Sequence, residues 1–210
     1  MTLVVPFVTG AFTWTGIEYL LHRFVGHGRR RPAPSSLWRR LTPSGFLGAF
    51  NDEHLRHHAD ARYFAPTSQK VVAAIVVASV LTTVGTLLVG AMAGAAFGIG
   101  FALMYATYEV LHRRIHTHAP HGRYGRWLRR HHLFHHFKTP RMNHGVTSPL
   151  WDKLTRTERR LPDGEPLRVP RHLAPPWMVD AQGGVQAEFA QEYVIPARGI
   201  TAEAPTGMCA

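Results

Sequence analysis

The chain is poor in cysteine and in acidic residues. Its single cysteine, Cys209, is next to last among 210 residues, so no internal disulfide can form, and no C-x-x-C pair exists for zinc, redox or iron–sulfur chemistry. Thirteen Asp and Glu stand against 24 Lys and Arg, for a formal net charge of +11. Such a balance indicates nucleic acid or an anionic membrane surface as a partner. The H-E-x-x-H motif of zinc hydrolases is missing as well.

Charge is absent from one long segment. Residues 71–108 contain neither a charged residue nor a histidine. A single helix of this length would measure about 57 Å, nearly twice a ~30 Å hydrocarbon core. We therefore predict two membrane spans, at about 71–89 and 92–111. A buried soluble hairpin is the alternative, but the segment lacks the polar face of a soluble helix. Glycines suited to a turn and to close helix packing stand at positions 90, 94, 98 and 100.

A third span is predicted at about residues 3–21, where only Glu18 is charged. A signal peptide would carry its basic residues before the apolar run, whereas here they follow it. The segments 22–70 and 112–160 are basic, so the positive-inside rule places both in the cytoplasm. The apolar hairpin and the absence of a recognised nucleic-acid-binding module argue against a nucleic-acid partner.

Histidine, in contrast, occurs 15 times, mostly in four groups. The groups read H-x-x-x-x-H, H-x-x-H-H, H-x-x-x-H and H-x-x-H-H. Their members are His22 and His27; His54, His57 and His58; His112 and His116; His132, His135 and His136. Residues three and four apart share a helix face, so each of the last three groups aims its imidazoles in one direction.

Two local features are expected beside these groups. His22 and His27 are five residues apart, a rotation of ~140° on a straight helix, so we expect Gly26 and Gly28 to break the helix and let both rings turn inward. Residues 51–53, Asn-Asp-Glu, are typical of a capped helix start with an acidic first turn. We therefore predict that the helix of the second group begins there.

Ten clustered imidazoles on one side of a membrane predict metal binding. A metal ion takes roughly four to six ligands, so the number favours two ions over one. A redox pair fits better than structural zinc, although imidazole also binds zinc, copper and nickel. Glu18 and Glu109 share helix faces with His22 and His112. Each carboxylate either orients a ligand from behind or pairs with Arg23 or Arg113 at the interface.

The four groups, together with "NHGVTSPLWDKLTRT" at residues 143–157, resemble the fatty acid hydroxylase and sterol desaturase superfamily of integral membrane di-iron enzymes. The resemblance covers about residues 10–157. It implies an all-α membrane bundle with a cytosolic helical cap that carries the histidine boxes. It also implies two iron ions, which zinc could replace in a purified sample, together with dioxygen as co-substrate and attack on a C–H bond of a lipid.

Carried over box by box, the resemblance implies the metal ligands His22, His27, His54, His57, His58, His112, His116, His132, His135 and His136. Candidates for support behind these ligands are Glu18, Glu109, His131 and His144. The expected domain is 1–157, and residues 158–210 are expected to form a polar, partly flexible tail without assigned function.

The resemblance favours hydroxylation of a fatty acyl, sterol or related lipid. Lipid or sterol desaturation and carotenoid hydroxylation remain alternatives within the superfamily. A non-catalytic haem- or metal-binding membrane protein is a rival from another class, but paired haem ligands leave H-x-x-H-H unexplained. No G-x-G-x-x-G fingerprint is present, so an external reductase, ferredoxin or cytochrome is expected to supply electrons. Arg126, Arg129 and Arg130 are expected to meet lipid headgroups or such a donor.

Overall fold

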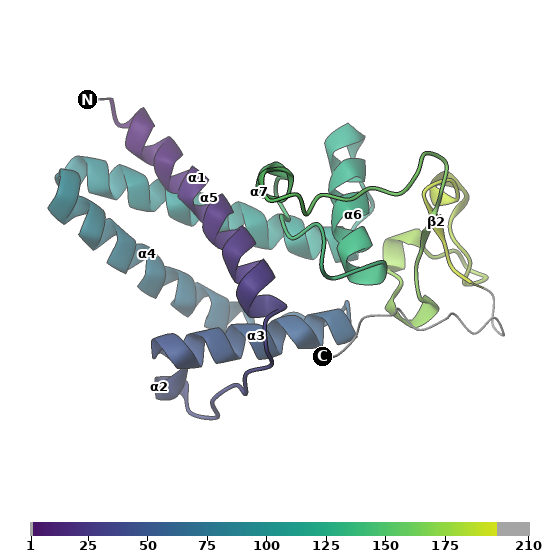
Figure 1. Cartoon of the computed structure of the whole chain (residues 1–210), viewed down its shortest axis with the longest axis horizontal. Coiled ribbons are helices and arrows are strands. Elements are labelled where there is room, and N and C mark those ends of the chain that lie inside the picture. The colour runs from purple at the N-terminus through teal and green to yellow at the C-terminus, as the bar shows by residue number, and fades with distance from the viewer. Residues whose placement is uncertain (1, 197–210) are drawn as a thin grey trace. The chain divides into compact units, whose positions relative to one another are not determined.

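The computed structural model describes residues 2–196 and is mostly helical with almost no sheet (Figure 1), which confirms the predicted all-α class. The chain divides into two compact units. The first comprises Met1–Glu53 and Phe64–Leu111, and the second comprises His54–Tyr63 and His112–Ala210. Helices α3 and α5 each contribute residues to both units.

Three helices of the described residues are long and apolar enough to cross a membrane: Val4–Gly26, Thr67–Val89 and Ala91–Thr117. They overlap the three predicted spans. The first combines α1 (Val4–Leu20) with a turn of π-helix, η1 (Leu21–Gly26), and the others are α4 (Thr67–Val89) and α5 (Ala91–Thr117). Gly90, with φ +90°, makes the predicted turn between α4 and α5. No residue of α4 is buried, so its apolar side chains suit contact with lipid.

Helices α1 and α5 approach each other at glycines. A Cβ atom on Gly10 would strike the carbonyl oxygen of Phe97, and one on Gly100 would strike that of Phe7. Small residues at such crossings let backbones pack closely where no hydrophobic force drives helices together. Beside this crossing, Trp14 meets Tyr105 edge-on, with ring centroids 4.8 Å apart.

Helix α3 (Pro43–Ala59) begins eight residues before the predicted start at Asn51. Thr42 supplies the cap, because its Oγ1 accepts the N–H of Gly45 at 3.2 Å, and proline suits the first helical position. Asn51 is instead fully buried within the helix. Its amide donates to the carbonyl of Val25 at 2.7 Å and accepts the N–H of Arg31 at 2.8 Å. The prediction was wrong because the polar run serves a distant chain segment rather than its own helix end.

The second unit is built around α6 (Gly122–Phe137) and α7 (Leu150–Leu154). A two-stranded parallel sheet pairs β1 (Leu167–Arg168) with β2 (Tyr193–Val194). Short 3₁₀ turns cover Arg171–Leu173, Pro176–Met178 and Ala187–Phe189. Apolar side chains buried along residues 158–196 are Leu167, Val169, Ala174, Trp177, Met178, Phe189, Tyr193 and Ile195. The sequence predicts a polar, partly flexible tail from residue 158, whereas the structure packs this stretch into the unit. Residues 197–210 lie outside the described part.

Replacing Gly10 with valine tests the α1–α5 crossing. The added atoms would meet the backbone of Phe97, so we expect a loss of about 1–3 kcal/mol from overpacking. The lipid-facing change Val84→Leu is the control, because Val84 is 47% exposed on α4. Thermal unfolding in detergent measures both. Equal midpoints for G10V and wild type would contradict the close crossing.

Candidate metal centre

Five histidines of the second unit converge from three helices. We call His57 of α3, His112 and His116 of α5, and His132 and His136 of α6 the five-histidine cluster. One ring nitrogen from each lies within 4.8 Å of the others, and four of the five side chains are buried. The H-x-x-x-H and H-x-x-H-H spacings therefore aim these rings at one point, as helical periodicity predicts.

The nitrogen separations in the cluster fit ligands of a single ion. The Nε2 atom of His116 lies 3.2 Å from that of His57 and 3.1 Å from that of His132. Two nitrogens bound at ~2.1 Å to one metal lie about 3.0–3.4 Å apart, for angles between a right angle and the tetrahedral value. A cation placed between these atoms would thus need little movement of the rings.

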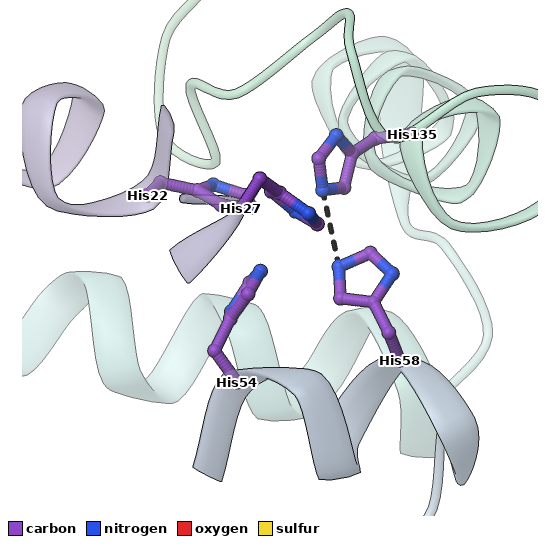
Figure 2. A group of neighbouring side chains, drawn as sticks. All are labelled: His22, His27, His54, His58 and His135. Carbon is purple, nitrogen blue, oxygen red and sulfur yellow. Dashed lines mark hydrogen bonds between the residues drawn. The ribbon is translucent and has the colours of Figure 1, made fainter. Parts of the chain in front are cut away.

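A second set, the three-histidine group, adjoins the cluster in the same unit. Figure 2 shows His54 and His58, one turn apart on α3, with His135 of α6. The Nε2 atoms of His58 and His135 are 3.1 Å apart. The ring of His58 stacks on that of His136 at 4.0 Å between centroids. The unit therefore holds two neighbouring sets of imidazole nitrogens.

Backbone carbonyls fix which ring nitrogen carries the proton. The Nδ1 atom of His57 donates to the carbonyl oxygen of Tyr63 at 2.8 Å, and that of His135 donates to the carbonyl of Met142 at 2.7 Å. A carbonyl can only accept, so the proton sits on Nδ1. The Nε2 lone pair then faces the neighbouring histidines. Metal-ligating histidines are commonly held in this way.

Burial keeps the central rings neutral. Loss of solvent lowers the pKa of His136 well below its usual value, and the nearby imidazoles of His58 and His132 lower it further. Within the described residues, neither ring nitrogen of His136 has a hydrogen-bond partner. Buried polar atoms without partners are costly. Neutral rings with converging lone pairs are the donor set that a transition metal prefers.

The remaining two predicted ligands form a pair in the first unit. His22 and His27, both labelled in Figure 2, have ring centroids 5.3 Å apart. His22 is the second residue of the π turn Leu21–Gly26 and His27 directly follows the turn. The N–H of His27 donates to the carbonyl of His22 at 3.1 Å. The i to i+5 bond brings residues five apart onto one face. The helix ends at Gly26, as expected, but its last six residues widen into a π turn, which the sequence did not predict.

A buried carboxylate, Asp152 of α7, organises the loop after α6. It accepts the N–H groups of His144 and Gly145 at 2.9 and 2.7 Å, and the hydroxyl of Thr157 at 2.7 Å. The imidazoles of His131 and His144 lie 3.4 and 3.6 Å from its oxygens. The sequence marked this aspartate only as part of a motif, because its partners are identified by the fold.

Burial by itself would raise the pKa of Asp152. The nearby imidazoles of His131 and His144, together with hydrogen bonds from Gly145 and Thr157, outweigh that effect and hold the pKa well below its usual range. The ring of His144 lies 5.5 Å from that of His135, centroid to centroid. His131 and His144 thus connect the buried charge to the segment that carries three predicted ligands.

The two predicted glutamates lie in the first unit. Glu109 forms an ion pair with Lys70 at 2.6 Å, a cation that the sequence did not single out. Glu18 is buried on α1, one turn before His22. Supporting roles for both remain predictions.

Arg129 is not on the surface, contrary to expectation, but is 4% exposed. Its guanidinium donates to the carbonyls of Arg114 and His118 at the end of α5, with distances of 2.9 and 2.6 Å. It also lies over the ring of Trp177 at 5.7 Å, and the indole N–H of Trp177 donates to the carbonyl of Ile115 at 2.9 Å. Two side chains therefore hold the last turn of α5, which carries His116.

Replacing Arg129 with methionine should lower the free energy of unfolding by about 2–3 kcal/mol, because the charge-assisted hydrogen bonds to carbonyls at the helix end are lost. Removing the buried charge offsets part of this loss. Arg126→Met, one turn earlier on α6, is the matched control, since Arg126 is 45% exposed and pairs with Glu192. Chemical or thermal unfolding reports the difference. Equal losses in both variants would contradict the capping role of Arg129.

The substitution Asp152→Asn should show a characteristic pH dependence. A carboxyl group with a depressed folded pKa contributes stability above its unfolded pKa, ~3.9, and loses it as the pH falls towards the folded value. The stability gap between wild type and D152N should therefore be constant above about pH 5 and narrow below about pH 4. Unfolding midpoints between pH 7 and 3 measure this gap, with Asp163→Asn on the exposed surface as control. A gap that does not change with pH would contradict the assignment.

Known proteins match this chain over most of its length. It is 32% identical over 154 residues to the dihydroceramide fatty acyl 2-hydroxylase FAH2 of Arabidopsis thaliana, covering 72% of this chain and 59% of the relative. The fatty acid 2-hydroxylase of Rattus norvegicus is 33% identical over 159 residues, or 72% of this chain and 40% of the relative. The chain thus spans about half the length of these curated relatives.

A solved structure and a family model agree with these relatives. The structure described as full-length scs7p, with only the hydroxylase domain visible, is 27% identical and has a TM-score of 0.54, covering 79% of this chain and 58% of that one. The model of the fatty acid hydroxylase family matches residues 7–157, which include all four histidine groups and the segment around Asp152. The chain belongs to the fatty acid hydroxylase family.

Proposed function

We propose that the protein is a membrane-bound enzyme that hydroxylates a C–H bond of a lipid acyl chain with dioxygen. The observation that carries the proposal is the pair of adjoining histidine sets. Within each set, neighbouring Nε2 atoms lie 3.1–3.2 Å apart. The relatives' names, dihydroceramide fatty acyl 2-hydroxylase and fatty acid 2-hydroxylase, support a fatty acyl substrate and attack at carbon 2.

Each histidine set would hold one iron ion. The five-histidine cluster offers enough nitrogens for one site by itself. The three-histidine group supplies three, which is fewer than the roughly four to six that a metal ion takes. We propose that His22 and His27 complete this second site, because the π turn sets both rings on one face.

Bound iron would supply the activation of dioxygen, a chemistry that no protein side chain performs. The chain's own residues prepare the site. The carbonyls of Tyr63 and Met142 retain protons on Nδ1 of His57 and His135, which leaves Nε2 available. Asp152, through His131 and His144, keeps the end of α6 and the following loop in place. Glu18 and Glu109 are proposed to support the histidines that follow them on α1 and α5.

Hydroxylation by dioxygen consumes two electrons and two protons, since the second oxygen atom leaves as water. We propose an external reductase, ferredoxin or cytochrome as their source. The basic segments 22–70 and 112–160 support a cytoplasmic location of the histidine sets by the positive-inside rule, which is where soluble electron donors occur.

The metal assignment is tested by His57→Gln, which removes a nitrogen that faces His116. Iron plus zinc per purified chain, measured by mass spectrometry, should be about two for the wild type and at least one lower for the variant. Hydroxylated acyl product formed under isotopically labelled dioxygen should fall at least tenfold. His172→Gln is the control, because His172 is exposed and outside both sets.

Other results would redirect the assignment. A double bond instead of a labelled hydroxyl would indicate a desaturase. A strong haem absorption band, or unchanged metal content in H57Q, would contradict the proposed di-iron site.

A further inference from the structure

A basic loop follows the first histidine pair and has no role in the proposed chemistry. Residues 28–42, here called the basic loop, connect η1 to α3 and include the short helix α2 (Leu37–Arg40). Residues 19–51 contain six arginines and no acidic residue. Five of these arginines lie in the basic loop, at positions 29, 30, 31, 39 and 40. All but Arg40 are exposed, so the loop presents concentrated positive charge.

The basic loop is attached to the ends of two membrane spans. Arg40 donates to the side-chain oxygen of Gln69 at 2.9 Å, and Gln69 is in the first turn of α4. At the other side, the N–H of Arg31 is bound by Asn51, whose amide also holds the carbonyl of Val25 at the end of the first span. Because both attachments are at span ends, the loop lies at the level where the helices leave the hydrocarbon.

Two large apolar side chains of the loop point outward. Trp38 is 78% exposed and Leu41 is 46% exposed, so neither contributes to the core of the first unit. Tryptophan beside arginine is typical of the membrane–water interface, where the indole sits at headgroup level and the cations meet phosphate. This combination favours a lipid surface over an acidic soluble protein.

The surface of the basic loop is also hollowed. A shallow cavity of about 370 Å³ is lined by Arg31 and Arg39, by Thr42 and Ser44, and by neighbouring prolines and glycines. Guanidinium groups are donors that bind phosphate oxygens in a bidentate manner. The hydroxyl of Thr42 already donates to the carbonyl of Arg39 at 2.7 Å, so the two arginines are the phosphate donors of the cavity. The cavity thus has the size and chemistry for the phosphate of a lipid headgroup, with Trp38 and Leu41 nearby in sequence to contact acyl chains.

We propose that the basic loop binds anionic phospholipid headgroups, with phosphate at Arg31 and Arg39 and with Trp38 and Leu41 between the lipid chains. This contact holds the segment between the first histidine pair and α3 against the membrane surface. It requires no catalytic activity, so it stands independently of the proposed hydroxylation.

Lipid retention tests the proposal with the full-length protein. The protein is placed in nanodiscs of phosphatidylcholine and phosphatidylglycerol, released into detergent, and its bound lipids are measured by native mass spectrometry. We expect wild type to retain phosphatidylglycerol over phosphatidylcholine, and the double variant Arg31→Gln/Arg39→Gln to lose this preference by about tenfold or more. The control is Arg62→Gln/Arg168→Gln, which removes the same charge from exposed positions of the second unit.

Two further measurements do not depend on how the arginine variants fold. The wild-type preference should weaken as salt concentration rises. Brominated acyl chains should quench a component of tryptophan fluorescence that is absent in Trp38→Phe. Equal losses in the R31Q/R39Q and control pairs, or no Trp38 quenching, would overturn the proposal. So would inorganic phosphate that displaces the bound lipid at millimolar concentration, because the site would then bind a free anion.

Discussion

A buried imidazole can bind a metal only when the nitrogen facing the ion carries no proton, and this constraint governs the second unit. The proton must therefore be placed on the opposite nitrogen by a group that can accept but never donate. The backbone carbonyls of Tyr63 and Met142 do this for His57 and His135. Each carbonyl belongs to a segment just after the helix that carries the ligand, so the loops after α3 and α6 determine the chemistry of the rings.

Two buried charges, on Asp152 and Arg129, lie outside the clustered histidine rings. The buried carboxylate of Asp152 is stabilised by hydrogen bonds from backbone N–H groups and a hydroxyl and by two nearby imidazoles. The buried guanidinium of Arg129 is stabilised by hydrogen bonds to carbonyls at the end of α5. A full charge so buried would be costly without these partners. Each charge therefore stabilises the backbone on one side of the centre, and neither enters the coordination space.

Periodicity and hydropathy predicted what depends on local sequence. The three spans, the turn at Gly90, and the convergence of rings spaced three and four residues apart all follow from helical geometry. What the sequence could not reveal depends on partners far along the chain. Asn51 resembles a helix cap until Val25 and Arg31 are placed beside it, and Arg129 resembles a surface charge until the end of α5 covers it. The packing of residues 158–196 could not be predicted, because the apolar residues of this stretch follow neither a helical nor a strand period. Its two strands are only two residues long.

The π turn at Leu21–Gly26 carries a consequence for how this sequence can change over evolutionary time. A π turn is equivalent to one residue inserted into an α-helix, and the insertion is what turns His27 towards His22. Loss of a single codon within the turn would leave every histidine intact while rotating one of the two by about 100°. Selection on this helix therefore acts on length as well as on identity, and descendants of the gene should tolerate exchange of residues here far better than gaps.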